Sequence, residues 1–416
     1  MTNAEPDSET SEAPLWTFVP PGDYRVPSDT VENSLRTRLT AFWRNLRQPD
    51  AAEARPPAEA DQLEALPVRL LDEIAPPDEW PGAVAGLEEA LDAHAADRND
   101  GTAIGIIGAP FSGHTQALAA VAARRRWARI PPPTTREIIF TPDDWIDRIR
   151  QTATRSPWVL LGLEKCFLRH PRGLQAVRLL LAELTAGRLG QGAVTCGSWA
   201  WAYLEVAAGA GILPVLTPQA LEGERLWRWL ARLAGPQARA GCSFRLGDSQ
   251  EAFFPNPQTR ADSGEQAAPP GDYLTLLAAC SRGIGGVARA MWRHSLRRMP
   301  PEADAKTARN ADTDAGHRRQ VIRVLPKIAP LLPSVPSVER PAGDFVLHSL
   351  LLHDGQPEEL LLELLPLPPF TIMQALERLQ SAGVAVQAGG SWQVAPLAYP
   401  TVRRHLEDRN FLTDPF

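Results

Sequence analysis

Cysteine is scarce in this sequence, with four in 416 residues, and none of them forms a C-x-x-C pair. This spacing excludes a zinc ribbon and a disulfide framework, so we expect the reducing cytoplasm. Long apolar runs are missing as well, since no stretch reaches the roughly 18 apolar residues that span a membrane. The acidic start MTNAEPDSET also lacks the apolar centre of a signal peptide.

Basic charge is not in excess either. The net charge of −6 argues against a globally basic nucleic-acid binder. Proline, in contrast, is abundant, and its 40 residues cluster in segments that we interpret as linkers. A chain of this length has room for roughly two or three domains.

The first 62 residues form an acidic start, a basic helix and a linker. Residues 1–31 carry six acidic residues and one arginine, a composition typical of disorder. Segment 32–47 predicts an amphipathic helix with arginines on its polar face. It either packs on the chain itself, binds a protein partner or lies on an anionic membrane surface. Residues 48–62 are predicted to be a linker. The apolar face of the helix holds Leu35, Leu39, Phe42, Trp43 and Leu46.

The most informative stretch is AIGIIGAPFSGHTQALAAVAARR, residues 103–125. An apolar strand enters a glycine-bounded turn and a periodic helix follows, which is the context of a phosphate-binding loop. Gly108, Gly113 and Thr115 fit the pattern G-x-x-x-x-G-K-[ST], but His114 stands in the lysine position. We therefore predict nucleotide binding by these four residues, with ATP or ADP as the cofactor left open.

His114 changes the expected chemistry of this loop. A phosphate-loop lysine places a permanent positive charge near the β and γ phosphate oxygens. An unperturbed histidine has a pKa of about 6.5, so it is mostly neutral at pH 7. Gly108, Gly113 and Thr115 could still hold phosphates, but charge in the transition state of hydrolysis would be poorly neutralised.

From about residue 63, short apolar strands alternate with helices, which predicts an α/β domain with a parallel sheet (63–235). A helical lid (236–298) with two helices joined at 283–286, a proline-rich linker (299–342) and a further domain (343–416) are predicted to follow. The linker holds a basic patch of His317, Arg318, Arg319 and Arg323. The expected strands are 102–107, 137–140, 158–163, 193–196 and 212–216, and the expected helices are 81–96, 116–126, 142–151, 173–186 and a segment near 203–208.

The last domain has a pattern of its own. Apolar helices are expected at 345–352, 358–364 and 371–382, and VAVQAGGSWQVAP predicts a hairpin at Gly389–Gly390. Three helices followed by a hairpin are typical of a winged helix-turn-helix. Residues 343–416 hold nine acidic residues and four arginines, and Arg378 is the single basic residue of the expected recognition helix. Because DNA affinity depends on neutralising phosphates, this domain favours a protein contact over DNA.

Residues from roughly 63 to 300 resemble the AAA+ and STAND class of P-loop ATPases, and the C-terminal winged helix strengthens this resemblance. In that class, the strand beside the P-loop strand ends in an aspartate that holds magnesium and a glutamate that orients the attacking water. Here the run WVLLGLEKC places Glu164 at the glutamate position and Leu163 at the aspartate position. The resemblance makes Glu164 the candidate catalytic residue and argues against a well-anchored Mg²⁺.

The same resemblance suggests further site residues. Thr195 or Ser198 would be the polar sensor, or would simply cap the next helix. Arg289 would be the lid arginine that touches phosphate, or simply a surface arginine. Arg188 would be an arginine finger for a neighbouring subunit. Trp199 and Trp201 either pack in the core or form an interaction anchor.

Loss of both the lysine and the aspartate indicates a pseudo-ATPase. Our leading hypothesis is a cytoplasmic regulatory or scaffold protein that makes protein contacts through 32–47 or 343–416. One alternative is a slow ATPase that acts as a nucleotide-dependent switch through Glu164. The other is a winged-helix regulator that binds DNA.

Overall fold

The computed structural model describes residues 14–27, 63–77, 80–97, 103–247, 252–254, 271–299, 320–326, 332–336 and 341–416. The predicted helix 32–47 and the linker 48–62 lie outside these ranges. The patch residues His317, Arg318 and Arg319 also lie outside them.

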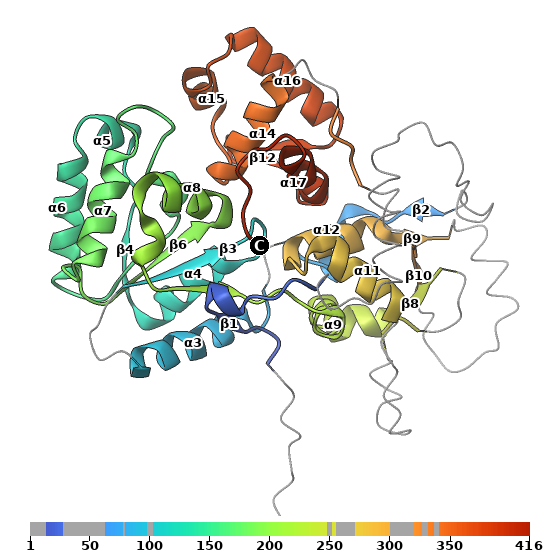
Figure 1. The fold of residues 1–416 in the computed structure, drawn as a ribbon. Helices are drawn as coiled ribbons and strands as arrows, with labels where there is room; N and C mark the ends of the chain where they lie inside the picture. Colours follow the sequence, from blue (N-terminus) through green and yellow to red (C-terminus); the bar gives the residue numbers. More distant parts are fainter. Residues whose placement is uncertain are drawn as a thin grey trace, which may run out of the picture.

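The centre of the fold is a six-stranded sheet in the order β1-β7-β3-β6-β5-β4 (Figure 1). All neighbouring strands run parallel, except that the edge strand β1 is antiparallel to β7. Every residue of β3 is buried, as expected for a parallel strand covered on both faces. The strands are β1 (Phe18–Val19), β3 (Ile104–Gly108), β4 (Ala128–Ile130), β5 (Trp158–Leu160), β6 (Gly192–Gly197) and β7 (Val215–Pro218).

Helices cover both faces of this sheet, which confirms the predicted parallel α/β core. α3 (Ala83–Asp97) and α4 (His114–Arg125) pack side by side on one face. The chain returns from β4 to β7 in the opposite direction, so its right-handed connections place α6 (Pro142–Ala153), α7 (Gln175–Thr185) and α8 (Ser198–Ala208) on the other face.

Two predictions about this sheet are wrong. Segment 137–140 is not a strand, because α5 (Thr135–Ile139) begins there with a capping box between Thr134 and Glu137. The missing strand is β4, which was not predicted from the sequence. The strand before Glu164 also does not lie beside the P-loop strand, because β6 separates β5 from β3.

A second, smaller sheet follows, so the region predicted as a helical lid is not purely helical. Its strand order is β2-β9-β10-β8. β10 comes from the segment predicted as a linker, and β10 pairs with both β8 and β9. The strands are β2 (Glu64–Ala65), β8 (Cys242–Leu246), β9 (Leu296–Arg298) and β10 (Gln320–Val324), and the helices around them are α2 (Val68–Ile74), α9 (Gly223–Gly241), α11 (Gly271–Ser281) and α12 (Gly285–Ser295).

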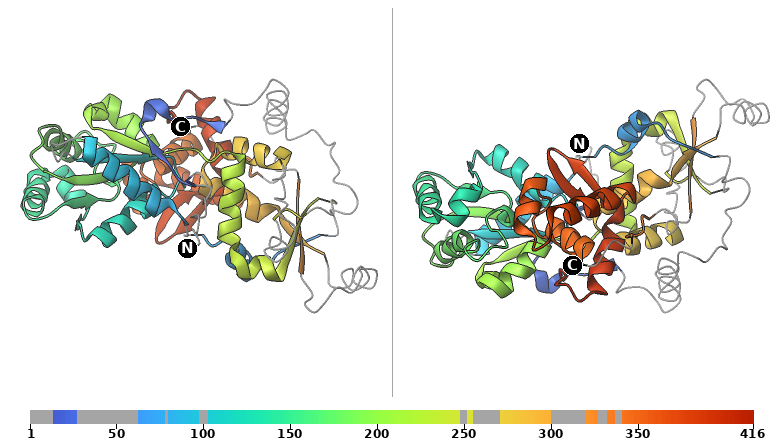
Figure 2. Two further views of the ribbon diagram at one scale, coloured as in Figure 1. Left: turned by 90° about the horizontal axis from the view of Figure 1, so that it is seen from below. Right: turned by 90° about the horizontal axis from the view of Figure 1, so that it is seen from above.

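Residues 341–416, here called the C-terminal unit, contain the three helices and the hairpin expected from their sequence. Gly389 and Gly390 have φ of 58° and 81°, the backbone that a two-residue hairpin turn requires. Figures 1 and 2 show this unit above the junction between the large sheet and α11–α12. Its elements are α14 (Ala342–Leu352), α15 (Glu358–Leu364), α16 (Pro369–Ser381), β11 (Ala385–Ala388), β12 (Ser391–Val394) and α17 (Tyr399–Glu407).

Within the described ranges, no helix combines the length and the apolar character needed to cross a bilayer.

The packing of β6 against β5 yields a stability prediction. A Cβ at Gly192 would lie 2.2 Å from the Trp158 ring, and this ring is buried and donates its indole N–H to the Leu189 carbonyl. We expect Gly192→Ala to lower the free energy of unfolding by about 1–3 kcal/mol through overpacking. Gly197→Ala is the control, because nothing lies within 4 Å of its Cβ position. Urea denaturation of both variants measures the difference, and equal stability would contradict this packing.

Candidate functional site

The glycine loop lies between the end of β3 and the start of α4, where the sequence predicts a phosphate loop. Gly113 has a φ of 77° and forms the N-cap of α4, so a residue with a side chain would be strained there. Phe111 also has a positive φ, of 66°. Gly108 pairs with Gly197 across the sheet, which brings the end of β6 next to the loop.

The His114 imidazole folds back onto the loop. A Cβ on Gly108 would lie 2.3 Å from His114 Nδ1, so the ring rests directly on this glycine. Ser112 Oγ and His114 Nδ1 form a hydrogen bond of 2.9 Å, and Thr115 Oγ1 lies 3.3 Å from His114 Nε2. The structure therefore brings Gly108, His114 and Thr115 together, but the polar atoms of the loop side chains are bonded to one another.

Burial removes the charge from His114. Its side chain is buried, and desolvation lowers its pKa to about 4, although the Cys196 backbone partly opposes this shift. The imidazole is therefore neutral at pH 7. It supplies no counterpart to the positive charge of a phosphate-loop lysine.

Trp80 covers the other end of the loop. A Cβ at Gly113 would lie 2.3 Å from the Trp80 ring, so the indole packs on the glycine backbone. Trp80 stacks on Trp229, with ring centroids 5.7 Å apart. Trp80 was not predicted as a site residue, because it lies 28 residues before Gly108 and no motif includes it.

Arg289 contacts Trp80. Its guanidinium lies 5.2 Å from the centroid of the Trp80 ring and donates to the Pro76 carbonyl at 3.1 Å. Arg188 forms an ion pair with Glu183 of the same chain, at 2.6 Å. Both arginines thus have structural contacts within the chain.

Glu164 lies beside the loop on a buried turn. Its Oε2 accepts the Gly197 N–H at 3.0 Å, and its side chain is buried. Desolvation and the nearby Asp354 carboxylate raise the pKa of Glu164 to about 7. The preceding Leu163 is fully buried and apolar, so the position that would anchor magnesium has no oxygen ligand. These residues do not fit a magnesium site.

The two sensor candidates are buried and bonded within the protein. Thr195 Oγ1 accepts the Gly162 N–H at 2.8 Å, which ties β6 to the turn that carries Glu164. Ser198 hydrogen-bonds to the Asp414 carboxylate. Neither side chain is directed at an open phosphate site.

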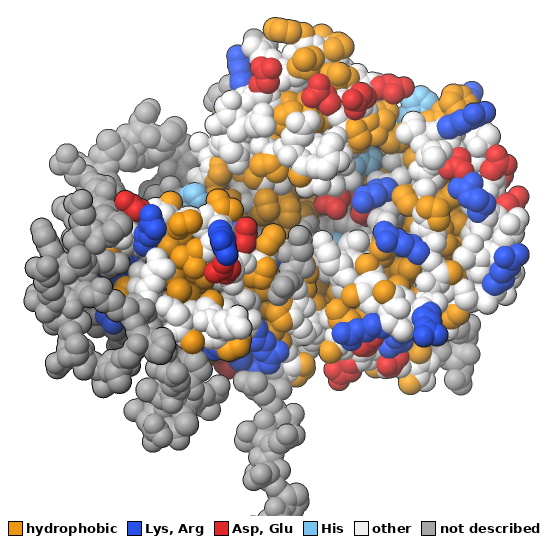
Figure 3. All heavy atoms as spheres, turned by 180° about the vertical axis from the view of Figure 1, so that it is seen from behind, with side chains coloured by type: hydrophobic (Ala, Val, Ile, Leu, Met, Phe, Trp, Pro, Cys, Tyr) orange, Lys and Arg blue, Asp and Glu red, His pale blue; other side chains and the backbone are white. Residues whose placement is uncertain are grey.

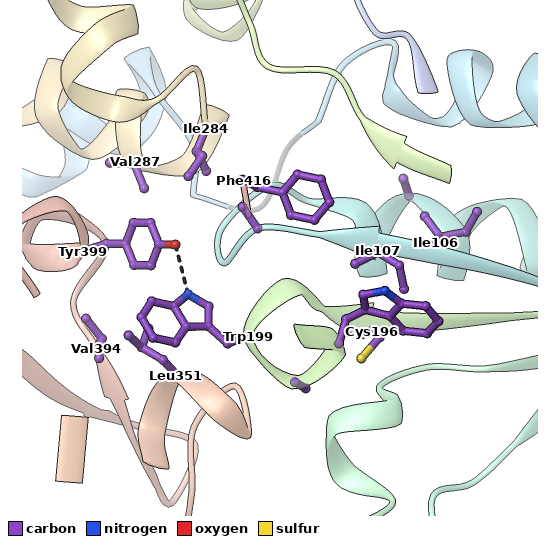
Figure 4. Packing of buried hydrophobic residues seen from close by; sticks show 14 of the residues in the cluster. Ile106, Ile107, Cys196, Trp199, Ile284, Val287, Leu351, Val394, Tyr399 and Phe416 are labelled. Carbon is purple, nitrogen blue, oxygen red and sulfur yellow. Dashed lines mark hydrogen bonds between the residues drawn. The ribbon is translucent and has the colours of Figure 1, made fainter. Parts of the chain in front are cut away.

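The C-terminal unit covers the same region of the core. His353 Nδ1–H donates to the Glu164 carbonyl at 2.9 Å. Trp199 donates its indole N–H to the Tyr399 hydroxyl at 3.1 Å (Figure 4). The Tyr399 ring contacts the ring of loop residue Phe111 edge-on, with centroids 5.8 Å apart. Of the two tryptophans singled out by sequence, Trp199 makes this contact, and the indole N–H of Trp201 donates to Glu205 on its own helix.

The space left beside the loop is too small for a nucleotide. The cavity next to Ala109 and Ser112 has a volume of about 10 Å³, which is enough for about one water molecule. Pockets for small-molecule ligands usually measure about 300–1,000 Å³. The side of the glycine loop formed by Ala109 and Ser112 is therefore closed to a nucleotide.

No family model and no curated protein matches the chain. Among solved structures, the RuvB Holliday junction branch migration motor of Thermotoga maritima aligns with a TM-score of 0.32 and 13% identity, over 80% of this chain and 98% of that one. The Walker-type ATPase PABY2304 of Pyrococcus abyssi aligns with a TM-score of 0.29 and 11% identity, over 79% and 96%. Our assignment of a P-loop NTPase-like fold rests on the strand order and on the strand–glycine loop–helix connection.

The raised pKa of Glu164 predicts a pH-dependent stability. A folded-state pKa of about 7, above the ordinary 4.5, means that wild-type stability falls as pH rises from 4.5 through 7. Glu164→Gln keeps an oxygen for the Gly197 N–H but removes the titration. We expect this variant to gain stability relative to wild type between pH 5 and pH 8, measured by urea denaturation.

Glu183→Gln is the matched control. Its ion pairs with Arg188 and Arg150 lower the pKa of Glu183 to about 2, so its contribution is present above pH 4.5 and lost only in acid. We expect this variant to lose the same amount of stability at pH 5 and pH 8. A parallel pH response of Glu164→Gln and Glu183→Gln would contradict the assignment.

Proposed function

We propose that this chain is a P-loop protein without efficient ATP hydrolysis, a pseudo-ATPase that acts as a regulator or scaffold through protein contacts. The observation that carries the proposal is the neutral His114 imidazole resting on Gly108, where a working loop needs a cation near the phosphates. The buried Leu163 supports it, since hydrolysis also needs a magnesium anchor.

The C-terminal unit is the proposed regulatory part, and we assign it as a winged helix from its three helices and hairpin. Its contacts with Glu164, Trp199 and Phe111 couple its position to the loop. Nucleotide would bind the loop only when this unit is displaced, because the closed cavity cannot hold it.

The outer surface of the unit favours a protein partner over DNA. Phe370 and Met373 on α16 are 74% and 43% exposed, although α16 would be the DNA-reading helix of a winged helix. Figure 3 shows hydrophobic side chains at the top of the molecule, where α15 and α16 lie, with acidic side chains below them. Exposed apolar side chains suit a protein interface. The acidic charge of the domain repels a phosphate backbone.

Hydrolysis measurements test the proposal. We expect no appreciable ATP turnover by the unmodified protein or by His114→Lys, because position 163 still lacks a carboxylate for magnesium. The double variant His114→Lys with Leu163→Asp is the informative one, since it restores both missing groups. Robust turnover by the unmodified protein that is lost in Glu164→Gln would favour the slow ATPase instead.

The predicted partner surface can be tested separately. We expect Phe370→Glu to abolish co-purification of a specific protein partner without lowering the melting temperature. Val206→Glu is the matched control, because Val206 is also apolar and 80% exposed but lies on α8 of the core. If the protein instead shifts duplex DNA at physiological salt in sub-micromolar amounts and Arg378→Ala removes the shift, the DNA-binding alternative is correct.

A further inference from the structure

The last six residues of the C-terminal unit run back to the glycine loop. They begin on the unit itself, where the Phe411 ring lies 5.9 Å from the Phe345 ring and 5.1 Å from the His348 ring. The Leu412 carbonyl accepts from His348 Nε2 at 3.3 Å. Figure 1 places the C-terminus between the large sheet and α12. We call residues 411–416 the tail.

Asp414 fixes the path of the tail between the two parts of the molecule. Its side chain is fully buried, and its carboxylate accepts from Ser198 of the core and from Arg403 Nε of α17 at 3.1 Å. A buried carboxylate is strongly unfavourable without such partners. The tail is therefore held in one position by a specific ionic contact.

Phe416 then fills the space beside the loop. Its ring is 3% exposed and lies edge-on to Tyr24, with centroids 4.8 Å apart. Arg282 Nε donates to the main-chain oxygen of Phe416 at 2.9 Å. Figure 4 shows Phe416 between Ile284 of the lid region and the β3 residues Ile106 and Ile107. The walls of the remaining cavity include the loop residues Ala109 and Ser112 and the aromatic residues Trp16 and Tyr24.

We propose that the tail is an intramolecular competitor of nucleotide, with the Phe416 ring occupying the place of a purine base. The proposal rests on the function proposed above, because it assumes that the loop binds nucleotide when opened. A purine is planar and aromatic, like the Phe416 ring, and the pocket that this ring enters is lined by Tyr24 and Ile284 together with the loop residues Ala109 and Ser112. Base and Phe416 cannot occupy this space together, since only about 10 Å³ remains.

The consequence is a measurable exchange between tail and ligand. A ligand that binds only the tail-free state has its affinity reduced by the fraction of molecules in that state. Displacement of the tail would also break the Ser198–Asp414 contact, which would loosen the C-terminal unit. Nucleotide binding and exposure of the C-terminal unit are thus linked through residues 411–416.

Binding of a fluorescent nucleotide, mant-ADP, to the full-length protein tests the proposal. We expect Phe416→Ala to bind the probe at least about tenfold more tightly than wild type. Phe416→Leu, which keeps an apolar plug, should lie between them. Leu412→Ala is the matched control from the same tail, because its side chain is 44% exposed, and it should bind like wild type.

Amide hydrogen exchange of residues 411–416 provides the second readout. We expect millimolar ATP to speed exchange of the tail in the wild-type protein. If the probe binds wild type and Phe416→Ala equally and the tail stays protected, the competition is wrong while nucleotide binding by the P-loop protein stands. If Phe416→Ala frees the tail but neither protein binds the probe, nucleotide binding itself is wrong, and the competition falls with it.

Discussion

The buried Asp414 carboxylate joins the C-terminal unit to the core. It lies between Ser198 at the start of α8 and Arg403 of α17, with the Tyr399 hydroxyl 3.4 Å away. Burial raises the pKa of Asp414, and the Arg403 guanidinium opposes that rise only in part. Because the carboxylate cannot be buried without its partners, the C-terminal unit and the core have one favourable relative position.

Around this contact, the core and the C-terminal unit meet through buried aromatic and imidazole side chains. Trp199 and Tyr399 are buried and bonded to each other. Desolvation lowers the pKa of His348 and of His353 to about 4, as it does for His114, so all three imidazoles are uncharged at neutral pH. A neutral, packed phosphate loop suits contact with another part of the protein better than contact with a triphosphate.

The elements of the fold differ in how far the sequence predicts them. The strands around 104–108, 158–160 and 192–197 were predictable, because parallel strands buried on both faces are continuous apolar runs. The helix at 135–139 was not, because its short apolar run Ile138–Phe140 looks like a strand unless the Thr134–Glu137 capping box is noticed. Strand β10 was not predicted, because it lies in a proline-rich segment that was interpreted as a linker. Its pairing partners β8 and β9 come from other segments of the chain, so no local pattern indicates the pairing.

The sequence by itself determined the glycine loop and its two chemical defects, because Gly108, Gly113 and His114 belong to one short motif and Leu163 to another. Only the tertiary structure decided what occupies the loop. Trp80 lies over Gly113 and Phe416 lies beside Ala109, yet both are far from the loop in sequence. Such contacts depend on how whole elements pack, and no local pattern encodes them. The same packing gave the three sensor candidates partners within the protein that no sequence motif indicates: Thr195 bonds to Gly162, Ser198 to Asp414 and Arg289 to Pro76.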